Sequence, residues 1–137
     1  MTENIKKRRP QFRNIQIFQI LQYRLPIAGF MSILHRVSGA GMFLALPLIV
    51  WLFDMSITSE LSYAQLLELT DTIAVKLLLC GLSLAFIHHF MGGIRHLIND
   101  MHIGISKEAS PLMAKGFLAA SLVVSSVAWA AIFGVLS

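Results

Sequence analysis

The sequence predicts an all-α integral membrane protein with three transmembrane helices. Of its 137 residues, 56% are hydrophobic and only 13% are charged, and the mean hydropathy is +0.72. Such a chain could not fold in water without exposing a large apolar surface. A helix needs about 20 mostly apolar residues to cross a hydrocarbon core of ~30 Å. The length therefore admits about three crossings and excludes a separate soluble catalytic domain.

Residues 1–28 are expected to form a basic cytoplasmic tail, which holds six of the eleven Lys and Arg residues. Between Phe12 and Leu25, apolar residues recur every three or four positions. This pattern is typical of an amphipathic helix on a membrane or partner surface, although residues 15–21 also alternate as in a strand. The apolar run begins too late for a secretory signal, so we expect no processing.

Residues 29–137 are expected to form the transmembrane domain, with spans at about 30–53, 74–98 and 116–136. The loop at 54–71 holds four acids and no Lys or Arg, whereas the second loop carries Lys107 and Lys115. By the positive-inside rule, the N-terminus and second loop are cytoplasmic, and the first loop and C-terminus face outside. This topology accounts for the basic charge without nucleic acid. The single cysteine, Cys80, excludes an intrachain disulfide and a cysteine-based metal cage.

Two polar clusters interrupt the first two spans, at 32–39 and 88–100. Ionisable side chains in hydrocarbon cost about 2.5–3.5 kcal/mol each, so each cluster indicates a function. Helical spacing places the following residues on one face of the first span: Ser32, His35 and Arg36. It places a second set on one face of the second span: His89, Gly92, Gly93 and His96.

The two clusters are expected to lie on the same side of the bilayer, because the first span leaves the cytoplasm and the second returns to it. At 1.5 Å per residue, Arg36 lies about 9 Å and His89 about 14 Å below the cytoplasmic surface. A histidine flanked by glycines within a cationic ring suits a flat dianionic cofactor. Imidazole ligates iron, glycines admit the ring, and Arg or His pairs with propionates.

These motifs resemble those of a known family. The chain has Ser-x-x-His-Arg-x-Ser-Gly at 32–39 and, about fifty residues later, His-x-x-x-Gly-Ile-Arg-His-Leu-x-x-Asp at 89–100. This arrangement resembles the cytochrome b subunit of succinate dehydrogenase, the larger membrane anchor of respiratory complex II. The resemblance covers the whole chain, from Arg9-Pro10 in the basic tail to the third span.

The resemblance implies a function in haem binding. His89 would be the axial ligand to the iron of one haem b, and a second hydrophobic anchor subunit would supply the other axial histidine. The three helices would thus form half of a haem-binding bundle. Four side chains become candidates for contact with the haem propionates: His35, Arg36, Arg95 and His96.

The resemblance also implies a quinone site and a set of partners. Ser32 and Arg36 would hydrogen-bond ubiquinone near the iron-sulfur subunit, and a flavoprotein subunit would oxidise succinate. The chain would anchor the complex and help to build the site for electron transfer, without dehydrogenase chemistry of its own. Its location would be the bacterial inner membrane, with the C-terminus in the periplasm.

Several alternatives stay open at the level of sequence. His88 could also ligate iron, although only His89 keeps the family spacing, and His102 receives no role. Arg36 could extend to the lipid headgroups instead of binding quinone. A fumarate reductase anchor working with menaquinone fits the same motifs. A small transport or channel subunit is a rival from another class, but it would need more acidic residues in the spans.

Overall fold

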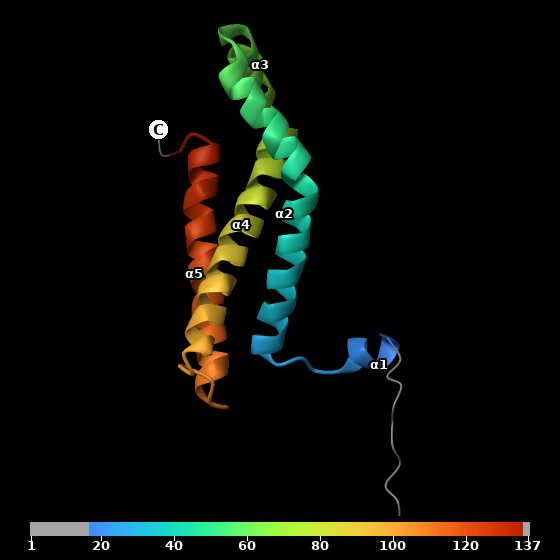
Figure 1. Ribbon diagram of the computed structural model, residues 1–137, viewed down its shortest axis with the longest axis vertical. Helices are drawn as coiled ribbons and strands as arrows, with labels where there is room; N and C mark the ends of the chain where they lie inside the picture. The colour runs from blue at the N-terminus through green and yellow to red at the C-terminus, as the bar shows by residue number, and fades with distance from the viewer. Residues whose placement is uncertain (1–16, 136–137) are drawn as a thin grey trace, which may run out of the picture.

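The computed structural model describes residues 17–135, and these residues form helices joined by short connections (Figure 1). The helices are α1 (Ile17–Gln22), α2 (Ile27–Thr58), α3 (Glu60–Asp71), α4 (Ile73–Asp100) and α5 (Ala109–Ile132). The prediction of an all-helical protein with three spans is confirmed, because α2, α4 and α5 are each long and apolar enough to cross a membrane. The basic residues at positions 6–13, and Phe12 and Ile15 of the expected amphipathic segment, lie outside the described residues.

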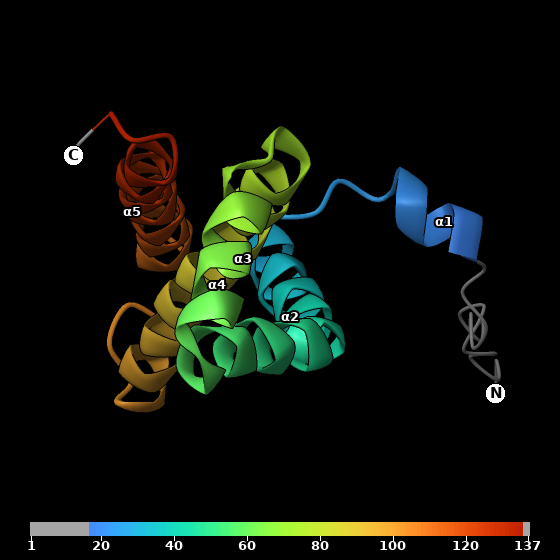
Figure 2. The same cartoon turned by 90° about the horizontal axis from the view of Figure 1, so that it is seen from above.

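The central helix is α4, with α2 on one side and α5 on the other (Figures 1 and 2). The indole Nε1–H of Trp129 in α5 donates a hydrogen bond to the backbone oxygen of Cys80 in α4, with 3.0 Å between nitrogen and oxygen. Cys80 is free and buried at this contact, as expected of a packing residue. The α4 helix therefore contacts both of the other spans.

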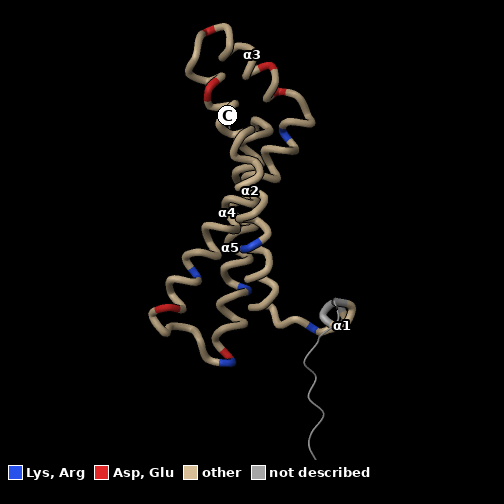
Figure 3. Tube along the Cα trace, turned by 45° about the vertical axis from the view of Figure 1, so that its right-hand side comes forward, with Lys and Arg blue, Asp and Glu red and all other residues tan. Residues whose placement is uncertain are grey.

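The acidic segment between the first two spans is a helix, α3, where the sequence analysis expected a loop. Its start is stabilised by a capping box, in which the Ser59 hydroxyl accepts from the Ser62 backbone and the Ser62 hydroxyl accepts from the Ser59 backbone. The α3 helix lies at one end of the molecule and extends past the C-terminal end of α5 (Figure 1). Figure 3 shows a group of acidic residues at this end, with further acidic residues at the opposite end. Three of the four acids at 54–71 therefore lie on this helix, and Asp54 lies near the end of α2.

Two spans are longer than the sequence analysis expected. Helix α2 continues to Thr58, and α5 begins at Ala109 instead of near residue 116. Pro111 lies in the first turn of α5, where backbone N–H groups have no acceptor within the helix, so proline is tolerated there. Lys115 thus belongs to the helix, although it was assigned to the loop.

The interior of the bundle is small and partly polar. Its buried side chains include Met31, Cys80 and Ala114, together with the polar residues His88, Arg95, Ser121 and Ser125. Large apolar side chains point outward instead, such as Phe43 and Leu44, which are 71% and 77% exposed. In a soluble protein this distribution would be reversed. A surface of this kind suits contact with lipid.

Candidate functional site

Three histidines from two helices meet where α2 lies against α4. The rings of His35 in α2 and His89 in α4 are stacked, with centroids 4.0 Å apart and planes inclined by 10°. The ring of His96, two turns further along α4, meets His35 edge-on at a centroid distance of 5.1 Å. The structure thus brings together three of the candidate residues that the sequence assigned to two separate clusters.

The imidazole of His89 is held by the backbone of the facing helix. Its Nδ1 lies 2.9 Å from the carbonyl oxygen of His35. A carbonyl oxygen can only accept, so Nδ1 carries the hydrogen and donates. Nε2 has no hydrogen-bond partner among residues 17–135, and in the neutral ring it retains its lone pair. This tautomer, with one nitrogen donating to a carbonyl and the other free, is the one that metal-bound histidines adopt.

Two glycines create the space for these rings. A methyl group on Gly39 of α2 would lie 2.7 Å from Cε1 of His89, and one on Gly92 of α4 would lie 2.6 Å from Cδ2 of His35. Both distances are far below van der Waals contact. Each helix therefore places a glycine opposite the histidine of the other, and any larger residue would push the rings away.

The two candidate quinone residues, Ser32 and Arg36, lie one turn apart on α2. Ser32 is half-buried and Arg36 is exposed. Within the described part of the chain, neither side chain has a hydrogen-bond or ion-pair partner. Both therefore have donors free for a ligand from outside the chain.

His88, the neighbour of His89, points elsewhere. It is 6% exposed, and its Nδ1 lies 3.3 Å from the hydroxyl oxygen of Ser121 in α5. That hydroxyl donates to the backbone oxygen of Leu118 at 2.8 Å, so the imidazole Nδ1–H donates to it in turn. His88 also lines a cavity of about 390 Å³ between the three spans. It is thus enclosed within the chain, whereas His89 is partly exposed.

Arg95 is separated from the histidine group. It is 4% exposed, and its Nη2 donates to the hydroxyl of Ser110 in α5 at 3.3 Å. Its Nε has no hydrogen-bond partner among the described residues. Two of the four propionate candidates, His35 and His96, contact one another beside His89. Arg36 follows His35 in the chain, whereas Arg95 faces α5.

Sequence analysis assigned no role to Ser38 or Ser121, and it used Gly39 only as part of the motif at 32–39. The structure places all three residues against the histidines. Ser38 and Gly39 follow His35 by three and four positions, so they share its helix face, and this spacing was the available signal. For Ser121 no local pattern was available, because its contact depends on how α5 packs on α4.

Residues 17–135 do not provide a site for a bare metal ion. Among the described residues, there is no group of three or more His, Cys, Asp or Glu side chains placed to hold a metal. A haem iron needs only one such side chain from each of two sources, because the porphyrin supplies four nitrogens. The free Nε2 of His89 and the glycine beside its ring fit that requirement.

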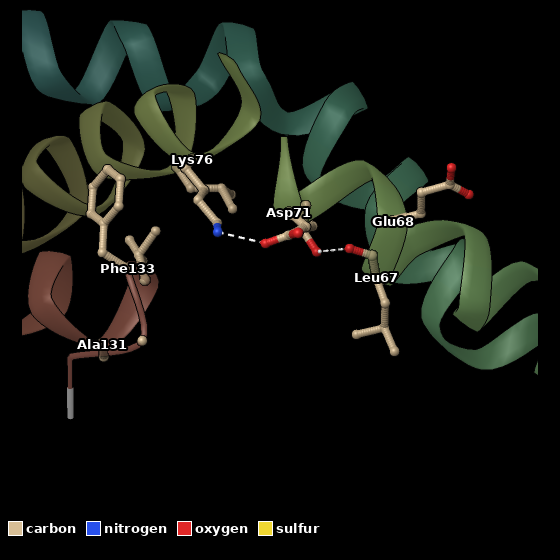
Figure 4. Close-up of a pocket in the computed structure, with 10 residues that line it drawn as sticks. Leu67, Glu68, Asp71, Lys76, Ala131 and Phe133 are labelled. Carbon is tan, nitrogen blue, oxygen red and sulfur yellow. Dashed lines mark hydrogen bonds and ion pairs between the residues drawn. The ribbon is translucent and has the colours of Figure 1, made fainter. Parts of the chain in front are cut away.

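A second, more polar hollow of about 750 Å³ lies at the other end of the molecule, between the end of α3, the start of α4 and the end of α5 (Figure 4). Lys76 pairs there with Asp71 at 2.6 Å, and its hydrogen bond holds the pKa of the Asp71 carboxyl below the usual value. Thirteen residues of α4 separate Lys76 from His89, about 20 Å of helix. This ion pair is therefore not part of the histidine site.

Comparison with known proteins gives consistent matches over most of the chain. The model of the succinate dehydrogenase/fumarate reductase transmembrane subunit family matches residues 6–128. The succinate dehydrogenase cytochrome b556 subunit of Rickettsia bellii is 29% identical over 93% of this chain and 95% of its own length. That of Rickettsia felis is 27% identical over the same shares. The subunit of that name from Paracoccus denitrificans is 28% identical over 75% of this chain and 79% of its own.

Proposed function

Because this chain belongs to the succinate dehydrogenase/fumarate reductase transmembrane subunit family, we propose that it is the haem-binding anchor of a succinate dehydrogenase. It shares one haem b with a second hydrophobic subunit and contributes to the site of ubiquinone reduction. An iron-sulfur subunit and a flavoprotein subunit bind on its cytoplasmic side and deliver electrons from succinate. Bound haem supplies a reversible one-electron carrier within the membrane.

The geometry of His89 carries this proposal. Its Nδ1–H donates to the His35 carbonyl oxygen at 2.9 Å, which leaves Nε2 free for iron. Only one axial ligand comes from this chain, so a histidine of the second anchor subunit is required on the other side of the haem. His88 is excluded from this role in the proposal, because it is enclosed between α4 and α5 and bonded to Ser121.

The propionates are assigned to cationic and hydrogen-bonding groups near His89. His35 and His96 contact each other beside it, and Arg36 is the next residue of α2. Arg95 is the weakest of the four candidates, since it is buried against α5 and bonded to Ser110. Its guanidinium would have to leave that contact before it could reach a propionate.

The quinone is assigned to the face of α2 that carries Ser32 and Arg36. A quinone carbonyl oxygen accepts hydrogen bonds, and both side chains are donors without a partner among residues 17–135. In the proposed topology this face lies near the cytoplasm, where the iron-sulfur subunit binds.

A reduced-minus-oxidised absorption spectrum of the intact membrane complex tests the haem assignment, with the neighbouring histidine as a matched control. His89→Leu is expected to abolish the low-spin b-type bands, because no other side chain of this chain replaces the ligand. His88→Leu is expected to retain them, at some cost in stability. Bands that survive in His89→Leu and disappear in His88→Leu would transfer the ligand role to His88.

The quinone assignment is tested by two assays of the same preparation. Ser32→Ala and Arg36→Leu should each lower succinate-driven quinone reduction by about 5-fold or more, because loss of a hydrogen bond to a substrate costs at least ~1 kcal/mol. Succinate oxidation by an artificial acceptor should remain, since it does not use this site. Equal loss in both assays would contradict a specific role in quinone binding.

A fumarate reductase anchor working with menaquinone is the second candidate, because the matching family model covers both enzymes. The quinone that supports turnover indicates whether the enzyme oxidises succinate or reduces fumarate. Two rates should be measured in one preparation: succinate oxidation with ubiquinone, and fumarate reduction with menaquinol. The faster reaction distinguishes a succinate dehydrogenase anchor from a fumarate reductase anchor.

A further inference from the structure

We propose that Ser38 and Gly39 are positioning residues for His89, which fix the rotation of its imidazole and thereby tune the haem that it ligates. The inference rests on the proposed haem ligation, and it assigns a function to two residues to which the proposed function gives none. Both lie on α2, on the face turned toward the ring of His89.

Ser38 provides a second oxygen for the ring nitrogen of His89. Its hydroxyl donates to the His35 carbonyl oxygen at 2.9 Å, and its Oγ lies 3.4 Å from Nδ1 of His89. Because the hydroxyl proton is directed to the carbonyl, the lone pairs of Oγ are available to the Nδ1–H. The N–H group is thus met by the carbonyl at 2.9 Å and the hydroxyl at 3.4 Å. A flip of the ring would place a carbon there and lose both contacts.

Gly39 determines how close α2 comes to the Nδ1–Cε1 edge of the same ring. A methyl group at this position would lie 2.7 Å from Cε1 and 3.1 Å from Nδ1. The ring face is covered by His35, stacked at 4.0 Å. One edge and one face of the imidazole are therefore defined by α2, and the Nε2 corner is the part that remains for iron.

The consequence for the haem follows from general coordination chemistry. The hydrogen bond of a ligating histidine's second nitrogen sets the basicity of the ligand, and the orientation of the ring affects the electronic structure of the iron. Changes at Ser38 and Gly39 should therefore alter the haem's reduction potential and ferric spectrum while the iron remains ligated. A merely structural role in packing α2 on α4 would leave these spectroscopic properties unchanged.

The test uses the intact membrane complex and three measurements. These are the midpoint potential of the haem, the electron paramagnetic resonance signal of its ferric form, and the rate of haem transfer to excess apomyoglobin. Ser38→Ala should retain one haem per complex, shift the potential and the resonance signal, and release haem about 10–100-fold faster. Ser38→Thr, which keeps the hydroxyl, should restore wild-type behaviour.

Gly39→Ala is paired with Gly41→Ala, two positions along α2, where an added methyl group would meet nothing within 4 Å. Gly39→Ala should displace the ring and change the haem signal or abolish haem binding, whereas Gly41→Ala should resemble wild type. Wild-type potentials, signals and release rates in Ser38→Ala would overturn the role of Ser38. Identical behaviour of the two alanine variants would overturn that of Gly39.

These outcomes are separable from failure of the ligand assignment. If His89→Leu keeps its b-type bands, the ligation itself is wrong. If His89→Leu loses them while Ser38→Ala and Gly39→Ala match wild type, only the positioning role is wrong.

Discussion

His88 and His89 differ in function because successive residues of an α-helix point in directions about 100° apart. His89 is directed to α2 and bonds to a backbone carbonyl, whereas His88 is directed to α5 and bonds to a hydroxyl. In a bundle with an apolar surround, each buried polar atom depends on a specific partner. A single hydroxyl, that of Ser121, is such a partner for Nδ1 of His88.

Replacement of Ser121 should therefore destabilise the protein without loss of haem. Ser121→Ala leaves the buried Nδ1–H of His88 without its acceptor, which costs about 1–3 kcal/mol. Thermal denaturation of the complex, followed through the haem bands, should show a lower midpoint with an unchanged starting spectrum. Ser126→Ala is the control, because Ser126 is exposed on the same helix and bonds only to its own backbone at Val123. Equal midpoints for the two variants would contradict the role of Ser121.

At the scale of the elements, α2 and α4 interlock through a reciprocal arrangement of histidine and glycine. Gly39 of α2 receives the ring of His89, and Gly92 of α4 receives the ring of His35. Small residues let helices approach closely in membranes, where apolar burial gives little drive for association. Here they also bring the two rings into contact.

The turn between α4 and α5 depends on a different glycine. Gly104 has φ +72°, and a methyl group there would overlap the sulfur of Met113 in α5. Gly104→Ala should cost about 1–3 kcal/mol from the left-handed backbone alone, with a further penalty for displacing Met113. The expected result is a lower yield of assembled complex and a lower midpoint of thermal denaturation.

Gly116→Ala is the control for this prediction. Gly116 lies in α5, and an added methyl group would meet nothing within 4 Å. Alanine also favours a helix over glycine, so stability should stay equal or rise. A Gly104→Ala complex as stable as Gly116→Ala would show that the turn tolerates a side chain.

The sequence predicted the features that depend on neighbouring residues better than those that depend on packing between distant segments. The three spans were predictable because hydropathy over about 20 residues is a local property. The α3 helix was missed because its three acids were interpreted as loop charge, although Ser59 and Ser62 carry the capping box. The meeting of His35 with His89 was foreseen only as a shared depth in the membrane, since the rotation of each helix about its axis depends on packing.

At the scale of the whole molecule, the distribution of polarity requires further subunits. The buried interior holds an arginine and a histidine, while large apolar side chains cover the exterior. Lipid satisfies the apolar surface, but it offers nothing to Ser32, Arg36 or the free Nε2 of His89. A second anchor subunit, haem and quinone would satisfy these groups, so the isolated chain should bind haem poorly and aggregate.

The charges predict an orientation for the bundle in the membrane, and cysteine labelling tests it. Acidic residues cluster around α3, whereas Lys107 lies in the turn between α4 and α5 and Lys115 lies in the second turn of α5. In a Cys80→Ser background, a membrane-impermeant maleimide should label Ser59→Cys from the periplasmic side. It should label Lys107→Cys only in inverted vesicles stripped of peripheral subunits. Both positions are exposed, so burial would not hide either thiol. The reverse labelling pattern would contradict the predicted orientation, and would mean that basic residues in the spans determine the topology more strongly than those in the tail and loops.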